Sequence, residues 1–267
     1  MPPGSLLIHK RVTPFQTLRV RERNGVRYLE SGRIRQAAVR VLDGEPALQY
    51  IPYTAAAWLF QPAIRRMLVI GLGGGSVGTY LQRRIAGLAV DYVEIDPAVP
   101  AVARGFMGFR EGPRTRVFHG DGRSFLRASR RTWDYILCDA FVGISMPLHF
   151  TTIQFLDEVR RRLAPRGVFA TNLAEGFTEP RAVSVVRTLR QRFRSLHLLR
   201  VRGLLNILAF AGDGPELTKA ELIAQGRAMD ARWRFDPPLS RLAAHRHSLE
   251  VEIPSASVLS DEPAAGL

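Results

Sequence analysis

Cysteine is almost absent from the sequence. Cys138 is the only cysteine among 267 residues, so no disulfide can form within the chain, and we expect a cytoplasmic protein. No apolar run approaches the roughly 18 residues that a membrane-spanning helix needs. The opening MPPGSLLIHKRV also lacks the charged start and long apolar stretch of a secretory signal. We therefore expect no association with a membrane.

Lysine is also scarce, although the chain is strongly basic. Lys10 and Lys219 are the only lysines, which leaves 36 arginines among the 38 basic residues and a net charge of +14. The arginines are scattered and do not alternate with aromatic residues, as they do in many nucleic-acid-binding surfaces. We interpret the charge as a feature of overall composition, and binding to nucleic acid is the less favoured alternative.

The pattern of apolar residues predicts an α/β protein in three parts. Residues 1–60 alternate in strand fashion with turn signals at Asn24-Gly25 and Asp43-Gly44, which indicates a small domain of β-hairpins. Residues 61–235 alternate short apolar strands with helical patterns, which is typical of a doubly wound, mostly parallel sheet. We expect its last two strands to form an antiparallel hairpin. Residues 236–267 are predicted to be a flexible C-terminal tail.

A glycine cluster follows the first strand of the larger domain. In MLVIGLGGGSVG, Gly71, Gly73 and Gly75 come directly after the strand and before a helical pattern. Glycines at this point permit a tight turn and let a ligand lie against the backbone. The match to the dinucleotide motif G-x-G-x-x-G is incomplete, because Ser76 occupies its sixth position, and no Lys-Ser/Thr pair indicates a phosphate-binding loop.

Acidic residues stand at the ends of the next two predicted strands. Glu94 and Asp96 end VDYVEID, and Asp121 follows RVFHG. An acid at the second strand tip typically accepts hydrogen bonds from ribose hydroxyls. An acid at the third tip can accept one from an adenine amino group, which favours an S-adenosyl ligand over NAD.

These motifs together resemble the spermidine synthases, the polyamine aminopropyltransferases. MLVIGLGGGSVG, VEIDP, GDGRSFL and WDYILCDAF occur in the order and spacing of that family, and TPFQTLRV resembles its opening hairpins. The resemblance covers about residues 12–212 and is strongest to a divergent bacterial spermidine-synthase-like branch. It implies a seven-stranded sheet of methyltransferase type after an N-terminal antiparallel β-domain, and a homodimer.

The resemblance also implies a reaction and its residues. The reaction moves an aminopropyl group from decarboxylated S-adenosylmethionine to a small-molecule amine and requires no metal. Asp139 matches the general base, and Tyr53 matches a tyrosine that orients the amine. Cofactor contacts are implied for Gln16, Gln36, Gly71, Gly73, Gly75, Glu94, Asp121 and Gly122.

The sequence departs from the family at positions that bind the amine groups. Gly74 replaces an aspartate of the glycine turn, and Val142 replaces a second aspartate three residues after the base. Thr54 and Ala55 replace the polar pair that usually follows the tyrosine, and RGLLN replaces a covering loop. The donor could therefore be S-adenosylmethionine itself. The alternative function is a methyl- or alkyltransferase acting on a small molecule that is not a polyamine.

Four further residues carry side chains that could take part in chemistry. His149 lies on the loop after Asp139 and is interpreted as an ordinary loop histidine, with an acid or base role as the alternative. His245 and His247 are interpreted as surface residues rather than metal ligands. Cys138 is predicted to be a buried strand residue rather than a nucleophile.

Overall fold

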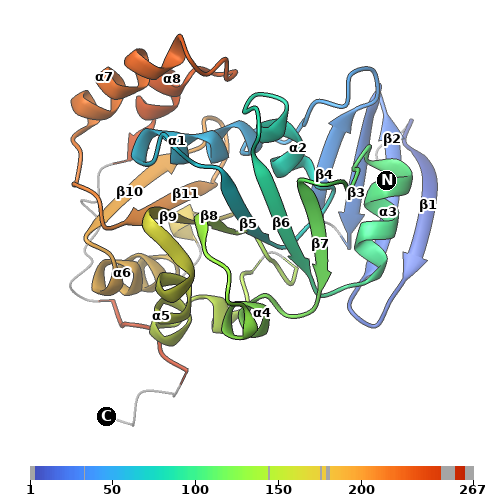
Figure 1. The fold of residues 1–267 in the computed structure, drawn as a ribbon. Coiled ribbons are helices and arrows are strands. Elements are labelled where there is room, and N and C mark those ends of the chain that lie inside the picture. The colour runs from blue at the N-terminus through green and yellow to red at the C-terminus, as the bar shows by residue number, and fades with distance from the viewer. Residues whose placement is uncertain are drawn as a thin grey trace.

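The computed structural model describes residues 4–32, 34–143, 145–174, 176–178, 181–247 and 256–261. It contains a small four-stranded sheet beside a larger eight-stranded sheet (Figure 1). This arrangement confirms the predicted α/β class and the preceding antiparallel β-domain.

The small sheet is an antiparallel meander of consecutive hairpins. Asn24 and Gly25 both have positive φ values, 50° and 69°, which fit the predicted tight turn between its second and third strands. Leu18 and Val20 alternate along one strand and are fully buried, so one face of the sheet packs against the rest of the molecule. The strands are β1 (Leu6–Val12), β2 (Thr17–Arg23), β3 (Val26–Ser31) and β4 (Ile34–Arg40).

The large sheet has the strand order β12-β10-β11-β9-β8-β5-β6-β7. Strands β9, β8, β5, β6 and β7 are mutually parallel, whereas β10 and β11 form the predicted antiparallel hairpin. This is the predicted seven-stranded doubly wound sheet with β12 added at one edge. Its strands are β5 (Arg66–Ile70), β6 (Ala89–Glu94), β7 (Thr115–His119), β8 (Trp133–Cys138), β9 (Leu163–Leu173), β10 (Ser195–Arg200), β11 (Ile207–Gly212) and β12 (Arg246–His247).

Helices cover both faces of the large sheet (Figure 1). One apolar cluster includes residues of α2, α3, α7 and α8, and a second includes residues of α4, α5 and α6. The helices are η1 (Ile51–Ala56), α1 (Ala57–Phe60), α2 (Ser76–Gln82), α3 (Ala98–Phe106), α4 (Gly122–Ala128), η2 (Leu148–Phe150), α5 (Ile153–Arg162), η3 (Gly176–Thr178), α6 (Ala182–Arg192), α7 (Lys219–Asp230) and α8 (Leu239–Ala243). Within the described ranges, no helix has the length and apolarity that a membrane crossing requires.

The expected domain boundaries need two corrections. Residues 51–60, assigned to the N-terminal β-domain 1–60, are helical and contribute Trp58 and Leu59 to the core they share with the large sheet. Residues 236–247, assigned to the flexible tail 236–267, instead form α8 and β12, and Leu239 and Leu242 are fully buried. Burial of their apolar side chains in the core holds both segments against the rest of the fold. Residues 248–255 and 262–267 of that expected tail lie outside the described residues.

Candidate active site

The glycine turn lies against the end of β8. Gly71, Gly73 and Gly75 have φ values of 95°, 53° and 70°, which L-residues with a side chain rarely adopt. A Cβ atom at Gly71 would lie 2.7 Å from the backbone oxygen of Asp139. The bare turn therefore brings the predicted cofactor-binding glycines and the predicted base to neighbouring strand ends.

Glu94 connects the tip of β6 to the glycine turn. Its two carboxylate oxygens accept hydrogen bonds from the backbone N–H groups of Leu72 and Asp96, each at 2.9 Å. Burial raises the pKa of Glu94, although those two backbone groups act in the opposite direction. Each carboxylate oxygen has a second lone pair, so this side chain could still accept from a ribose hydroxyl.

The N-terminal sheet reaches the same place through glutamines. The Nε2 of Gln16 donates to Asp96 Oδ2 at 3.1 Å, and the Nε2 of Gln36 donates to Gln16 Oε1 at 2.6 Å. Gln36 Oε1 is buried and accepts no hydrogen bond from the described residues. A Cβ atom at Gly73 would lie 3.2 Å from the backbone oxygen of Gln36. Gln36 thus lies against the glycine turn and Gln16 lies beside Asp96, and a ligand could complete the hydrogen bonding of Gln36.

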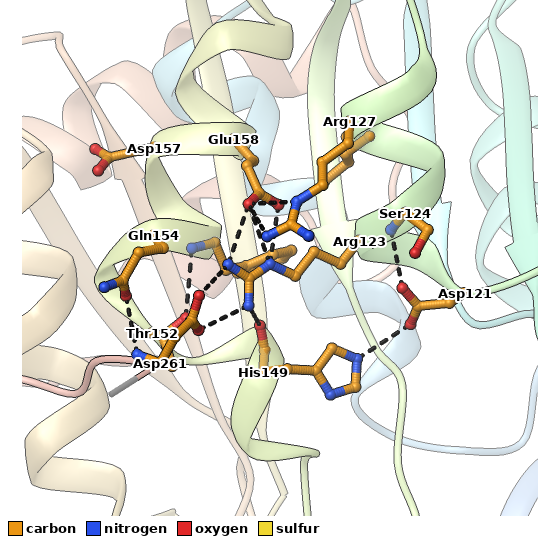
Figure 2. Close-up of polar contacts among 12 residues, drawn as sticks. Asp121, Arg123, Ser124, Arg127, His149, Thr152, Gln154, Asp157, Glu158 and Asp261 are labelled. Atoms are coloured by element: carbon orange, nitrogen blue, oxygen red, sulfur yellow. Dashed lines mark hydrogen bonds and ion pairs between the residues drawn. The ribbon is translucent and has the colours of Figure 1, made fainter. Parts of the chain in front are cut away.

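Asp121 follows β7 and caps the N-terminus of α4, which begins at Gly122. Its Oδ1 accepts a hydrogen bond from the Ser124 N–H at 2.8 Å, and its Oδ2 lies 3.1 Å from His149 Nε2 (Figure 2). Burial acts to raise the pKa of Asp121, but the hydrogen bonds from Ser124 and His149 outweigh it, so the net pKa is lowered. A Cβ atom at Gly122 would lie 2.3 Å from Ile70, so only glycine fits this approach to β5.

Asp139 lies at the carboxyl end of β8 inside a network of neutral polar side chains. The Tyr50 hydroxyl donates to Asp139 Oδ2 at 2.7 Å, and Asn172 Nδ2 donates to Oδ1 at 3.0 Å. Asn206 Nδ2 in turn donates to Asn172 Oδ1 at 3.1 Å. Burial raises the pKa of Asp139, while the bonds from Asn172 and Tyr50 act to lower it. A partly enclosed carboxylate with a raised pKa is a stronger base than a free one and is suited to accept a proton.

Tyr50, Asn172 and Asn206 were missed by the sequence reasoning. Asn172 stands near the carboxyl end of β9, the same edge position that identified Asp139, and this signal could have found it. Tyr50 is 89 residues from Asp139 in sequence, and no local pattern reports that contact.

Tyr53 does not make the contact that Tyr50 makes. Its hydroxyl lies 2.6 Å from His245 Nδ1 and accepts a hydrogen bond from the Arg202 N–H at 3.0 Å. His245, expected at the surface, therefore has a structural partner. Cys138 is fully buried in β8, as predicted, and burial raises the pKa of its thiol.

The amine-binding positions that depart from the family have distinct surroundings. A Cβ atom at Gly74 would lie 2.6 Å from the Ala37 Cβ, so the small sheet leaves no space for an acidic side chain at this position. Val142 is 74% exposed, and Thr54 and Ala55 are fully buried. The Thr54 hydroxyl donates to the backbone oxygen of Ile51 and Ala55 has no polar side chain, so neither side chain is available to bind a substrate.

Comparison with known proteins finds matches to the same family and to a methyltransferase. The spermine/spermidine synthase domain model matches residues 54–199, more than half of the chain. The polyamine aminopropyltransferase of Vibrio vulnificus is 34% identical over 177 residues, a match that covers 63% of this chain and 59% of that relative. The human eEF1A lysine and N-terminal methyltransferase is 31% identical over 185 residues, 63% of this chain but 26% of that protein.

A solved structure extends the likeness of fold to the whole chain. The probable spermidine synthase from Corynebacterium glutamicum superposes with a TM-score of 0.76 at 15% identity, covering 100% of this chain and 99% of that one. At this identity the likeness establishes the fold. The domain match over more than half of the chain shows that the chain belongs to the spermine/spermidine synthase family.

Proposed function

We propose that this chain is a transferase that moves an aminopropyl group from decarboxylated S-adenosylmethionine to an amine, with Asp139 as the general base. The observation that carries the proposal is the partly buried Asp139 carboxylate, held by Tyr50 and Asn172 beside the glycine turn. The relative in Vibrio vulnificus, named a polyamine aminopropyltransferase, supports the same activity.

The proposed chemistry needs only this chain's residues and its two substrates. The amine nitrogen attacks the aminopropyl carbon that is bonded to the donor's sulfonium sulfur. The bond between that carbon and sulfur breaks, and methylthioadenosine leaves with the bonding electrons. The attacking nitrogen loses a proton to Asp139. Because the raised pKa of Asp139 increases its basicity, this carboxylate can accept the proton as the C–N bond forms.

The donor is proposed to bind between the two sheets. Glu94 accepts from the ribose hydroxyls, Asp121 and the Gly122 N–H face the adenine, and Gly71, Gly73 and Gly75 let the nucleoside approach the backbone. Gln16 and Gln36 approach it from the small sheet. Tyr53 is the tyrosine that the resemblance assigns to orienting the amine, and Tyr50 is a second candidate because its hydroxyl contacts Asp139.

Release of methylthioadenosine from the decarboxylated donor and a panel of amines tests the proposal. Asp139→Asn should lower turnover at least 100-fold, roughly the smallest contribution of a general base, while nucleoside affinity stays within about threefold of the original protein. Asp213→Asn is the matched control, because Asp213 is exposed and pairs with Arg160 at the opposite end of β9 from Asn172. Unchanged turnover in Asp139→Asn would assign the base to another residue.

A methyl- or alkyltransferase is the second candidate. Gly74 favours it, since the 2.6 Å approach to Ala37 leaves no space there for an acid that would select a decarboxylated, cationic donor. The human relative is itself named a methyltransferase. Calorimetry with both donors separates the candidates: this one requires S-adenosylmethionine to bind at least as tightly as its decarboxylated form.

We also propose that the enzyme acts in the cytoplasm as a homodimer. The single cysteine supports the compartment, and the family resemblance supports the dimer. Light scattering that returns the mass of one chain would contradict the dimer.

A further inference from the structure

Residues 256–261, here called the C-terminal strap, lie across the start of α5. The Ile153 N–H donates to the Leu259 backbone oxygen at 2.8 Å, and the Leu259 N–H donates to Thr188 Oγ1 of α6 at 2.9 Å. The side chain of Leu259 packs against the apolar cluster beneath these helices. The strap is therefore attached to both helices by its main chain and by apolar contact.

Asp261, at the end of the strap, forms a two-pronged ion pair with Arg123 (Figure 2). Its Oδ1 and Oδ2 lie 2.8 and 2.6 Å from Arg123 Nη1 and Nη2, and Oδ1 also accepts from Thr152 Oγ1 at 2.7 Å. The hydrogen bond from Arg123 lowers the pKa of Asp261 to about 2, so this carboxylate stays charged at any working pH. A paired fork of this kind fixes the orientation of a guanidinium group.

Arg123 is otherwise enclosed by the protein. Its side chain is 8% exposed, and Glu158 of α5, which is 7% exposed, accepts from its Nε at 3.0 Å. The guanidinium group also contacts the segment that follows β8: Arg123 Nη1 donates to the backbone oxygen of His149 at 3.3 Å. Arg123 thus links α5 and the strap to the residue whose ring lies against Asp121.

The geometry points to Arg123 and Asp261 as positioning residues for the nucleoside site. Asp261 holds Arg123, Arg123 holds the backbone of His149, and the His149 ring orients the Asp121 carboxylate toward a bound adenine. This inference rests on the proposed function, in which Asp121 receives the adenine amino group.

The position of the Asp121 carboxylate depends on its contact with the His149 ring. The side chain of Asp121 is 31% exposed, and among the described residues its Oδ1 is held by the Ser124 N–H and its Oδ2 by the His149 ring. His149 itself lies on the short η2 turn, so its ring position depends on where its backbone is held. Loss of Asp261 would release one of the groups that fix Arg123 and, through it, that backbone.

Calorimetric binding of methylthioadenosine to four full-length variants tests the inference. Asp261→Asn and His149→Ala should each weaken binding about 5- to 10-fold, the low end for coupling through an intermediate residue. The double variant should bind no more weakly than His149→Ala alone, because both changes act through one route. Asp213→Asn, the same change in an exposed two-pronged Arg–Asp pair, is the control and should bind like the original protein.

Each outcome decides a different claim. Unchanged binding in Asp261→Asn, or additive losses in the double variant, would overturn the positioning role while leaving the proposed function intact. Failure of the original protein to bind methylthioadenosine would overturn both. Leu259→Ala loosens the strap without touching a charge, so it should reproduce the loss if Asp261→Asn folds poorly.

Discussion

At the scale of single residues, protonation of Asp139 is set by opposing effects. Burial raises the pKa of this carboxyl, while hydrogen bonds from Asn172 and Tyr50 stabilise the charged form and lower it. Burial and the nearby charge of Asp139 raise the pKa of Tyr50 well above its usual range, so the tyrosine stays protonated and donates. Asp139 can therefore act as a base at pH values above its pKa, and the hydrogen bonds from Asn172 and Tyr50 help to set that pKa.

Tyr50→Phe should move the acidic limb of the pH–rate profile to higher pH by about one unit. A general base works only when deprotonated, so activity rises as pH increases through the pKa of Asp139. Removing the Tyr50 donor raises that pKa further. The measurement is kcat/KM for methylthioadenosine release as a function of pH.

Tyr53→Phe is the comparison for this experiment, because the Tyr53 hydroxyl contacts His245 and the Arg202 backbone instead of Asp139. The acidic limb of the Tyr53→Phe pH–rate profile should lie at the same pH as in the original protein. If the acidic limb shifts in Tyr53→Phe and not in Tyr50→Phe, the tyrosine that acts at the base is Tyr53, the residue that the family resemblance selects.

At the scale of elements, strand ends were predictable and the contacts between distant segments were not. Periodicity placed Glu94, Asp121 and Asp139 at successive tips of one sheet, because parallel strands bring their carboxyl ends to one edge. The pairing of Tyr50 with Asp139 depends on how residues 51–60 fold into helices across that edge. That depends on packing between segments distant in sequence, which a local pattern does not contain.

The packing of α7 on α8 predicts that a glycine-to-alanine change in α7 lowers the stability of the fold instead of raising it. Replacing a helical glycine by alanine generally stabilises a protein by up to about 1 kcal/mol. Gly226 lies in α7, however, where an added Cβ would be 2.6 Å from the Ser240 backbone of α8. Gly226→Ala should therefore destabilise the fold by about 1–3 kcal/mol.

Urea unfolding measures this effect, with Gly105→Ala in α3 as the matched control. A Cβ at Gly105 would meet nothing within 4 Å, so that variant should be neutral or slightly more stable. Equal stabilisation by both substitutions would show that α8 does not pack on α7 as described.

At the scale of the whole molecule, the two sheets share one core. Leu18 and Leu29 of the small sheet belong to the same apolar cluster as Met67 of the large sheet and Leu239 of α8. The sequence indicated separate parts at residues 60 and 235, because the pattern of apolar residues changes there. The shared core instead ties the glutamines of the small sheet rigidly to the glycine turn.

The net charge of +14 also belongs to this scale, and its compositional interpretation makes a prediction that can be tested. Arginines form ion pairs with acids across the molecule, for example Arg83 with Glu45, Arg160 with Asp213 and Arg192 with Asp157. These acids are already counted in the net charge, so the pairs spread the arginines over the fold without reducing the excess of 14 positive charges. A binding surface for nucleic acid would instead gather unpaired cations along one face.

We therefore expect only weak binding to RNA or duplex DNA, with a Kd above about 10⁻⁴ M at physiological salt. Fluorescence anisotropy with labelled oligonucleotides measures it at about 50 mM and about 200 mM salt. A protein that neutralises several phosphates loses about 10³-fold or more in affinity over this range, because each contact releases counterions. Tight binding with that steep loss would show that the arginines form a nucleic-acid surface in addition to the nucleoside site.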